Sequence, residues 1–341
     1  MNKVNDKTIV KVADIFDDAA MLYFDGTTNP DIESSEVTNY RVQKLHTNFY
    51  ECFITVANVF MKYDRLKNIP ETFEKQIYEK LDELNTYIEE NGLNREELRR
   101  ALFFIDIKAF KNLNFSLDII TPDAVSIIVS HIVSYLIDPK SIGTLLDPNI
   151  GTANLIYSII NELNIEPRII GIDNHLLLTQ VCETKANLMQ TPMDIIYSDM
   201  LKILPHDIDL IVSDLASYEY TEEYSSNLYD AGVRYFPYLA IEHLLKIQNK
   251  VKMVFIIDND FFSQKGSDLF RNELSKLGNL LCLIALPDNF FLKGTMTKSI
   301  IILDNNKQST NVHTNVFNLP SLDDQKNFLL TMEKIKEALS D

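Results

Sequence analysis

The sequence predicts an α/β protein with a mainly parallel sheet, preceded by a helical domain. Two observations support this prediction. Before residue 114, apolar residues recur at helical spacing, which is typical of amphipathic helices. After it, short β-branched and aliphatic runs alternate with helical stretches, as in a sheet whose parallel strands are joined by helices. We therefore expect a helical domain over residues 1–113, an α/β domain over 114–320 and a C-terminal helix over 321–341.

The helical domain is predicted from three amphipathic segments. They are Tyr40–Lys62, Glu71–Glu90 and Arg95–Ala109. Pro70 suits the start of the second segment, because the fixed φ of proline is compatible with the first turn of a helix. Asn94 to Glu97 has the residue types of a capping box at the start of the third. The polar, turn-rich stretch Gly26–Ser35 is predicted to be a loop.

Seven short runs of aliphatic and β-branched residues are the candidate strands. They are Gly143–Leu146, Arg168–Ile172, Asp194–Tyr197, Leu210–Val212, Lys252–Ile257, Leu280–Ala285 and Ser299–Leu303. Amphipathic stretches such as Tyr238–Ile247 and Asp268–Leu277 lie between most of them, which favours a parallel arrangement. The last segment, Leu322–Ser340, is predicted to be a terminal helix.

The composition of the 341-residue chain indicates a globular protein. Hydrophobic residues make up 46% of it, which is enough for sizeable cores. The longest apolar runs fall well short of the roughly 20 residues that span a bilayer, and the first residues lack the apolar core of a signal peptide. We therefore expect a cytoplasmic protein without a membrane partner. Cys52, Cys182 and Cys282 form no CxxC pair, so neither a metal site nor a disulfide framework is predicted.

The charge of the chain argues against nucleic acid as a partner. Acidic residues outnumber basic ones 49 to 32, for a formal net charge of −17, whereas nucleic-acid binders usually present a basic face to the phosphates. One local cluster is dense enough to form such a face, and it consists of Arg95, Arg99, Arg100, Lys108 and Lys111. The same cluster is also typical of an ordinary solvated helix surface, so both interpretations stay open.

The most informative motif is the stretch from Leu145 to Leu155. A strand ends in Asp147, a tight loop with Gly151 follows, and a helix is predicted to begin at about Asn154. Glycine lets the backbone approach a ligand closely, and open α/β sheets bind their ligands at the carboxyl ends of the strands. The motif therefore predicts a small-molecule site at this edge of the sheet.

Two further acids follow the next predicted strands. Asp173 follows the second strand, in Gly171-Ile172-Asp173, and Asp199 follows the third. A carboxylate after the second strand can accept hydrogen bonds from both hydroxyls of a ribose, as in dinucleotide-binding folds. The G-x-G-x-x-G pattern of nicotinamide sites is absent from the sequence, so a nicotinamide cofactor is disfavoured.

This ordered set of motifs resembles the adenine-specific N6 DNA methyltransferases, especially stand-alone relatives of the type I restriction-modification subunit. Those proteins carry a D-P-x-x-G-T-G-N loop, matched here by Asp147 to Asn154, after a Thr-Pro helix start, matched by Thr121-Pro122. Their second-strand acid and third-strand Asp match the two acids named above. The resemblance implies a class I S-adenosylmethionine (SAM) methyltransferase fold, Rossmann-like with a mainly parallel seven-stranded sheet.

The resemblance also implies SAM as the cofactor. In such enzymes the loop holds the methionine part, the second acid holds the ribose and the third lies near the adenine. Carried over to the matching positions, the cofactor-binding residues are Thr121, Asp147, Pro148, Asn149, Gly151, Thr152, Asp173, Asn174, Asp199 and Met200. One departure is Ala153, which stands at the family's second glycine. Its methyl group is expected either to crowd the methionine part or simply to pack.

The catalytic motif of the family is only partly matched. These enzymes hold the amino group of a flipped-out adenine with N-P-P-Y or D-P-P-Y after the fourth strand. The Asn or Asp and the next carbonyl accept the two amino hydrogens, and the aromatic ring stacks on the base. Asp214 falls on the acceptor position here, and Leu215 supplies the next carbonyl. Leucine and alanine replace the two prolines and serine replaces the aromatic residue, so Tyr218 or Tyr220 is left to supply a ring.

Two interpretations of Asp214 remain open. In the first, Asp214, Leu215 and Tyr218 are the catalytic residues, and the loss of both prolines leaves them less rigidly held. In the second, Asp214 only caps the following turn. A later segment ending at Phe290 resembles the L-P-x-x-F stretch that lines the target-base side in type I subunits. Phe290 and Phe291 are then either stacking surfaces or core residues.

Three functions are compatible with these observations. The first is a SAM-dependent methyltransferase resembling adenine-N6 DNA methyltransferases, with a degenerate catalytic motif. The second is a catalytically impaired SAM-binding protein with a binding or regulatory role. The third is a methyltransferase acting on a non-DNA target, such as another planar amine or a protein side chain. The resemblance implies DNA as a partner, and the net charge disfavours it.

Overall fold

The chain folds into two compact units. One comprises residues 1–117 together with 176–192, and the other comprises 118–175 together with 193–341. The computed structural model describes residues 4–28, 48–248, 250–291, 295–306 and 313–340. Residues 40–47 of the helix predicted over Tyr40–Lys62, and residues 29–35 of the predicted loop, lie outside the described residues.

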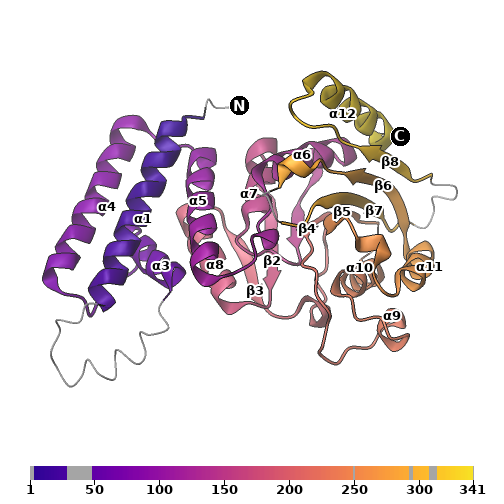
Figure 1. Cartoon of the computed structure of the whole chain (residues 1–341), viewed down its shortest axis with the longest axis horizontal. Helices are drawn as coiled ribbons and strands as arrows, with labels where there is room; N and C mark the ends of the chain where they lie inside the picture. The colour runs from indigo at the N-terminus through magenta and orange to yellow at the C-terminus, as the bar shows by residue number, and fades with distance from the viewer. Residues whose placement is uncertain (1–3, 29–47, 249, 292–294, 307–312, 341) are drawn as a thin grey trace. The chain divides into compact units, whose positions relative to one another are not determined.

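The first unit is a group of helices packed around one long helix. Its helices are α1 (Asp6–Thr28), α3 (Phe49–Phe60), α4 (Glu71–Asn91), α5 (Arg95–Leu113) and α8 (Leu176–Leu188). α1 packs against α3, α4 and α5, and α8 packs against α3. Figure 1 shows α1 and α4 running side by side. Gly26 to Thr28 continue α1, so the prediction of a loop is wrong for these three residues. A Cβ on Gly26 would lie 2.9 Å from the ring of Phe73 in α4, so this glycine permits close helix packing instead of a turn.

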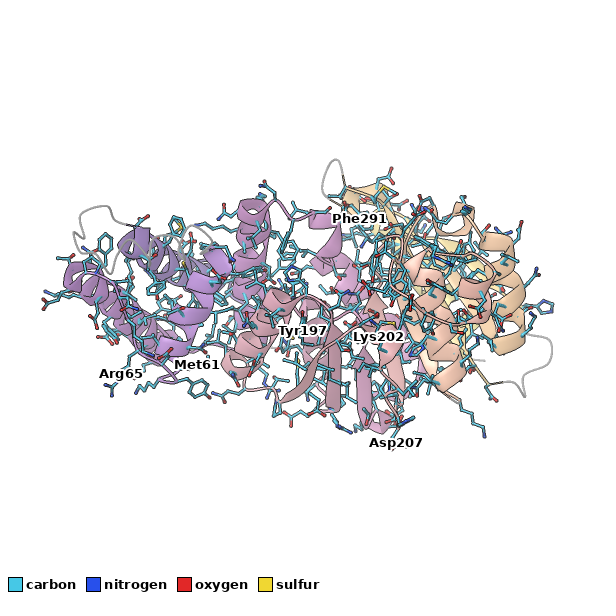
Figure 2. The ribbon with its side chains drawn as sticks, turned by 90° about the horizontal axis from the view of Figure 1, so that it is seen from below. Met61, Arg65, Tyr197, Lys202, Asp207 and Phe291 are labelled. Carbon is cyan, nitrogen blue, oxygen red and sulfur yellow. The ribbon has the colours of Figure 1, made fainter. Side chains whose placement is uncertain are left out.

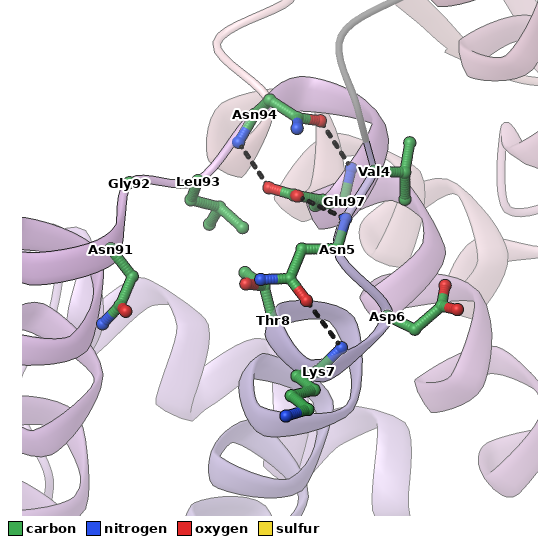
Figure 3. A pocket seen from close by; sticks show the side chains of 10 residues that line it. All are labelled: Val4, Asn5, Asp6, Lys7, Thr8, Asn91, Gly92, Leu93, Asn94 and Glu97. Carbon is green, nitrogen blue, oxygen red and sulfur yellow. Dashed lines mark hydrogen bonds between the residues drawn. The ribbon is translucent and has the colours of Figure 1, made fainter.

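The start of α5 has the capping box that the sequence predicts. Asn94 Oδ1 accepts a hydrogen bond from the Glu97 N–H at 2.9 Å, and Glu97 Oε2 accepts one from the Asn94 N–H at 3.0 Å. The same Glu97 carboxylate accepts from the Asn5 N–H at 2.8 Å, as Figure 3 shows. Glu97 thus joins the start of α1 to the start of α5 within an open groove of the first unit.

A buried ion pair attaches α8 to this unit. Lys185 Nζ of α8 donates to Asp106 Oδ2 of α5 at 2.7 Å, and the two side chains are 2% and 1% exposed. The Tyr50 hydroxyl of α3 donates to Asp106 Oδ1 at 3.0 Å. Burial, followed by the neighbouring carboxylate, raises the pKa of Tyr50. Because a buried charge is costly without a partner, this cluster ties three helices together.

The basic cluster of α5 is largely neutralised within the first unit. Arg99 is 1% exposed and pairs with Glu96 at 2.6 Å. Arg100 pairs with the same carboxylate at 2.8 Å, and Lys108 pairs with Asp17. Cations that are already paired with carboxylates offer little net attraction to phosphates. The structure therefore favours a structural role for this cluster over a nucleic-acid-binding face.

The second unit contains an eight-stranded mixed sheet (Figure 1). Its strands are β1 (Thr144–Asp147), β2 (Arg168–Asp173), β3 (Met193–Tyr197), β4 (Leu210–Asp214), β5 (Lys252–Asp258), β6 (Asn279–Ala285), β7 (Lys298–Asp304) and β8 (Asn315–Asn318). Their order is β3-β2-β1-β4-β5-β7-β6-β8. The first five strands in this order are parallel, whereas β7 runs antiparallel to β5 and β6. All seven predicted strands are confirmed.

The sheet differs from the predicted seven-stranded sheet by its edge strand β8. This strand pairs parallel with β6. It has only four residues, which alternate between partly buried and exposed positions, and Val316 is 64% exposed. Such a short edge strand lacks the aliphatic run that identifies a buried strand, so the sequence pattern did not reveal it.

Helices cover the sheet and complete the core of the second unit. They are α6 (Asp123–Leu136), α7 (Asn154–Leu163), α9 (Asn227–Asp230), α10 (Phe236–Ile247), α11 (Ser267–Leu277) and α12 (Gln325–Ser340). α6 packs on α7 and α12, and α10 packs on α11. Most residues of β1, β4 and β5 are buried, as expected for parallel strands covered on both faces. Among the described helices, none is both long enough and apolar enough to cross a membrane.

Carboxylates gather at one edge of this sheet. Four of the parallel strands end in an aspartate: Asp147, Asp173, Asp214 and Asp258. The carboxyl ends of parallel strands meet at the same edge. The antiparallel β7 begins at that edge with Lys298, which pairs in register with Asp258. The topology therefore places a cation among the strand-end acids.

Candidate functional site

Asp147 holds the loop that follows β1, which we call the β1 loop (residues 147–153). Its Oδ1 accepts hydrogen bonds from Ser213 Oγ at 2.6 Å and from the Asn149 N–H at 3.0 Å. Ser213 belongs to β4, so the carboxyl group joins the loop to the neighbouring strand. Asp147 is 2% exposed, and desolvation raises its pKa to about 7, although these hydrogen bonds oppose the shift. The group therefore titrates near neutral pH.

Asp173, at the end of β2, binds the same loop. Its Oδ2 accepts from the Gly151 N–H at 3.0 Å and its Oδ1 from the His175 N–H at 2.8 Å. Burial raises the pKa of Asp173, and these backbone bonds lower it in part. Gly151 has a φ of +53°, which glycine adopts without steric cost. A Cβ built there would meet nothing within 4 Å, so open space lies beside this part of the backbone.

Gly171 lets the β1 loop approach the sheet closely. A Cβ at this position would lie 2.2 Å from Ile150 Cδ1. The Ile150 N–H donates to the Ile172 carbonyl at 3.0 Å, which fixes the loop against β2. A side chain at residue 171 would push Ile150 away and move the loop with it. The end of β2 therefore contributes the close packing of Gly171 against the β1 loop in addition to the Asp173 carboxylate.

Ala153 packs inside the protein. It is 0% exposed and adopts a left-handed conformation with a φ of +61°. Such a conformation costs a non-glycine residue roughly 1–2 kcal/mol. Pro148 and Thr152 of the same loop are also buried. Of the two expectations for the methyl group of Ala153, packing is therefore the one that the structure supports.

A small cavity lies between the β1 loop and the segment that precedes α6. We call this segment, residues 118–122, the strap. The cavity measures about 20 Å³, which is room for about one water molecule. Asn154 Nδ2 donates to the Thr121 carbonyl at 3.1 Å, and Thr121 Oγ1 donates to Asp214 Oδ2 at 2.9 Å. The strap is thus bonded both to the start of α7 and to the predicted acceptor position.

Asp199 follows β3 and receives a hydrogen bond from a tyrosine. Its Oδ2 accepts from the Tyr220 hydroxyl at 2.5 Å. Met200, the next residue, is 5% exposed and its side chain belongs to the hydrophobic core. Tyr197 and Lys202, labelled in Figure 2, lie on either side of Asp199 in the sequence, and both are more than half exposed. Asp199 therefore lies between the core and an exposed surface.

Tyr218 lies close to the residues that are predicted to bind the cofactor. Its ring stacks on Phe236, with centroids 4.5 Å apart and an interplanar angle of 14°. Its hydroxyl hydrogen-bonds the side chain of Asn174. Desolvation, followed by the charges of Asp199 and Asp173, raises the pKa of Tyr218 well above its usual range. The structure thus bonds Tyr218 to Asn174 within reach of the charges of Asp173 and Asp199, and Phe236 covers one face of its ring.

Asp214, the predicted acceptor, is ion-paired. Lys298 Nζ lies 2.7 Å from Asp214 Oδ1, and the two side chains are 6% and 9% exposed. Lys298 also donates to the Asp118 carbonyl of the strap at 2.6 Å. With Thr121 bound to Oδ2, both carboxylate oxygens accept hydrogen bonds from the protein. These bonds connect Asp214 to the strap and to β7. Neither of the two interpretations from the sequence, substrate acceptor or turn cap, included these partners.

The residues after Asp214 are held by bonds of their own. Leu215 is 2% exposed, and its N–H donates to the Ile256 carbonyl at 3.0 Å. The Ala216 N–H donates to Asn149 Oδ1 at 2.9 Å. These bonds restrict the backbone where the family has its prolines. The greater mobility expected from the loss of both prolines stays a prediction, and these two bonds count against it at Leu215 and Ala216.

Two residues of this site were not predicted from the sequence. Ser213 precedes the predicted acceptor and binds Asp147, and Lys298 begins β7. A lysine at the start of an aliphatic run indicates a residue at the carboxyl edge of the parallel strands only if that strand is known to run antiparallel to them. Phe290 is 8% exposed, so the interpretation of this residue as core is the one supported. Phe291, labelled in Figure 2, is partly buried.

Comparison with known proteins identifies a relative in sequence. The chain is 25% identical over 307 residues to the uncharacterized protein YtxK of Bacillus subtilis, and the match covers 86% of this chain and 92% of the relative. No protein-family model matches the chain.

Solved structures with the same fold cover nearly the whole chain. A protein of Listeria monocytogenes, described as a candidate class I SAM-dependent methyltransferase, has a TM-score of 0.79 at 21% identity, over 98% of this chain and all of that one. The methyltransferase subunit of a type I restriction-modification system from Streptococcus thermophilus has a TM-score of 0.67 at 12% identity, over 97% of this chain and 92% of that one. The chain therefore has the fold of class I SAM-dependent methyltransferases, as the sequence predicts.

Proposed function

We propose that this chain binds SAM and transfers its methyl group to an acceptor. The observation that carries the proposal is the arrangement of Asp147, Gly151 and Asp173, which are joined by hydrogen bonds at the carboxyl edge of the parallel strands. Ligands of open α/β sheets bind at this edge. The descriptions of the Listeria and Streptococcus proteins as methyltransferases support the same function.

The residues at this edge fit the cofactor in their chemistry. Open space beside Gly151 suits the methionine part, which must approach the backbone closely. Each oxygen of Asp173 accepts one hydrogen bond from the backbone, and the Asn149 side chain also bonds to this carboxylate. A carboxylate has about four lone-pair sites, so one is left for a ribose hydroxyl. Asn174, Asp199 and Tyr218 would border the adenine. When bound, SAM supplies an activated methyl group, and these residues hold and orient it.

Cofactor binding requires the strap to move. The cavity beneath the strap measures about 20 Å³. Sites for ligands of about the size of SAM usually measure about 300–1,000 Å³. The strap is held by side-chain bonds from Asn154, Thr121 and Lys298. Breaking a few such bonds costs on the order of 1 kcal/mol each, which the binding of a charged cofactor can offset. We therefore expect the strap to shift when SAM binds.

Calorimetry with SAM and with its demethylated product tests this proposal directly. We expect saturable binding of both compounds to the full chain. The absence of heat and of thermal stabilisation with either compound would reject cofactor binding. Transfer of a tritiated methyl group to unmethylated DNA, compared between the unmodified protein and Asp214→Ala, then tests whether the acceptor is DNA. If both proteins transfer tritium to DNA only at background level, DNA is rejected as the acceptor and non-DNA acceptors become the favoured hypothesis.

A second candidate is a SAM-binding protein that does not transfer the methyl group and acts by binding or regulation. The engagement of both oxygens of Asp214 by Lys298 and Thr121 favours it, because an acceptor that is already bonded is poorly available to a substrate. The net charge of −17 also weakens attraction to duplex DNA, most of all at low salt. Binding of SAM without transfer to DNA, proteins or small amines would distinguish this function from the first.

A further inference from the structure

Lys298 occupies the position at Asp214 that a substrate amine would need. Its ammonium donates to Asp214 Oδ1 at 2.7 Å and to the Asp118 carbonyl at 2.6 Å. One carboxylate oxygen and one backbone carbonyl therefore receive two of its hydrogens. A substrate amine held by this loop would give its two hydrogens to the same kind of pair, namely Asp214 and a backbone carbonyl.

A neutral amine competes poorly with this lysine. A neutral amine bonded to the Asp214 carboxylate would gain a hydrogen bond to one ionised group, whereas the Lys298–Asp214 bond also gains the attraction between two opposite charges. The Lys298 and Asp214 side chains are 6% and 9% exposed, so solvent screens their attraction weakly. An incoming amine would also leave the lysine buried without its counter-charge, which is unfavourable. Displacement of Lys298 by an exocyclic amine is therefore strongly disfavoured.

The lysine is held in place from several sides. Asp258 is its partner in the β5–β7 register. Burial raises the pKa of that half-buried carboxyl, and the bond from Ser217 and the charge of Lys298 oppose the shift. The Met296 N–H, two residues before it, donates to Asp118 Oδ1 at 2.7 Å. The start of β7 is thus bonded to the strap at two points. When the strap shifts on SAM binding, the ion pair with Asp214 and the pairing of β7 with β5 still hold Lys298 beside Asp214.

We propose that Lys298 determines the specificity of the methyl-acceptor site by excluding exocyclic amines, such as that of adenine, from Asp214. The methyl acceptor of the natural protein is then a group that does not rely on Asp214 to accept its hydrogens. This inference rests on the proposed function, because it concerns the acceptor side of the same SAM site. It predicts that removing the lysine restores an amine-binding site.

The experiment uses the full chain and two variants. Lys298→Met alone would leave Asp214 buried without a counter-charge, so the main variant is Asp214→Asn with Lys298→Met, which removes both charges and places an amide acceptor at residue 214. Lys298→Arg is the matched control, because it keeps the cation. Each protein is given tritiated SAM and a single-stranded oligonucleotide that contains adenine. The same oligonucleotide with hypoxanthine in place of adenine lacks the exocyclic amine.

We expect the natural protein and Lys298→Arg to transfer equal amounts of tritium to the adenine and hypoxanthine oligonucleotides. The double variant should give at least tenfold more counts with adenine than with hypoxanthine. Adenine-dependent transfer by the natural protein would overturn the role of Lys298. So would a double variant that binds SAM as tightly as the natural protein and shows no preference for adenine. Calorimetry on all three proteins separates these results from failure of the proposed function, in which the natural protein does not bind SAM at all.

Discussion

Asp173 Oδ2 accepts a hydrogen bond of 3.0 Å from the backbone N–H of Gly151, which lies 22 residues earlier in the chain. The other oxygen accepts from the His175 N–H. The carboxylate proposed to bind the ribose of SAM therefore also fixes the loop proposed to bind its methionine part. A change at this residue affects both halves of the site.

Replacing Asp173 with alanine should weaken SAM binding by about 1.5–3 kcal/mol, the usual range for hydrogen bonds to a charged acceptor. Asp209→Ala is a matched control. Asp209 also accepts from two backbone N–H groups, at 2.9 and 2.8 Å, but it does so at the opposite ends of the strands. Calorimetry should show weaker binding for the first variant only. Equal losses of affinity in both variants would mean that the effect is a general loss of stability.

Asp147 should make the stability of the protein depend on pH. Its pKa is 3.8 in an unfolded chain and about 7 in the folded protein, where desolvation disfavours the charged form. Between these values the folded state binds more protons than the unfolded state, so the free energy of unfolding falls as the pH rises from about 4 to about 7. This pKa difference corresponds to a decrease in the free energy of unfolding on the order of 4 kcal/mol over that pH range.

The variant Asp147→Asn tests this dependence. Asparagine stays neutral throughout and can still accept from Ser213 and the Asn149 N–H, so the fall in stability over this window should become smaller. Urea unfolding at several pH values measures it. Asp173 and Asp258 also have raised pKa values, so part of the slope should remain. An unchanged slope in the variant would show that Asp147 is ionised in the folded protein well below neutral pH.

Replacing Gly171 with alanine should destabilise the protein by about 1–3 kcal/mol, because the added Cβ would overlap Ile150. Ile150→Val removes the Cδ1 atom that lies 2.2 Å from that Cβ. The double variant should therefore be more stable than the sum of the two single effects predicts. Denaturant unfolding of the four proteins measures this coupling. Simple additivity would exclude the proposed overlap.

Replacing Lys185 with methionine should destabilise the first unit by about 3–5 kcal/mol, because the buried Asp106 carboxylate would lose its 2.7 Å ion pair with the Lys185 ammonium. Lys67 offers a contrast, since it is 69% exposed and pairs at 3.0 Å with Asp64, whose side chain is 47% exposed. Lys67→Met should change the free energy of unfolding by less than about 1 kcal/mol. Thermal and denaturant unfolding compare the two variants. Similar effects from both would refute a special contribution of the buried pair.

The strands of the second unit could be predicted because buried parallel strands are nearly continuous aliphatic runs. The strand-end acids Asp147, Asp173 and Asp214 followed from the same pattern, since a polar residue that interrupts such a run marks the edge of the sheet. β8 could not be found in this way, because its four residues are half exposed at the edge of the sheet.

The hydrogen-bond partners of the site were not predictable from local sequence. Lys298 follows Asp214 by 84 residues, and only the antiparallel direction of β7 brings the two together. Gly26 was predicted to begin a loop, whereas it lies in α1 and permits close packing against Phe73. Both cases depend on tertiary contacts. Such contacts change the structural role of a residue without changing the local sequence pattern around it.

The path of the chain through α8 has a consequence for synthesis on the ribosome. Residues 176–192 belong to the same compact unit as residues 1–117, although they lie between β2 and β3 in the sequence. Asp106 therefore emerges from the ribosome long before Lys185, and the buried ion pair between them cannot form until α8 has been made. By then β1 and β2 have also been made. An early N-terminal fragment should thus stay incompletely packed, so the two units are expected to complete their folding together.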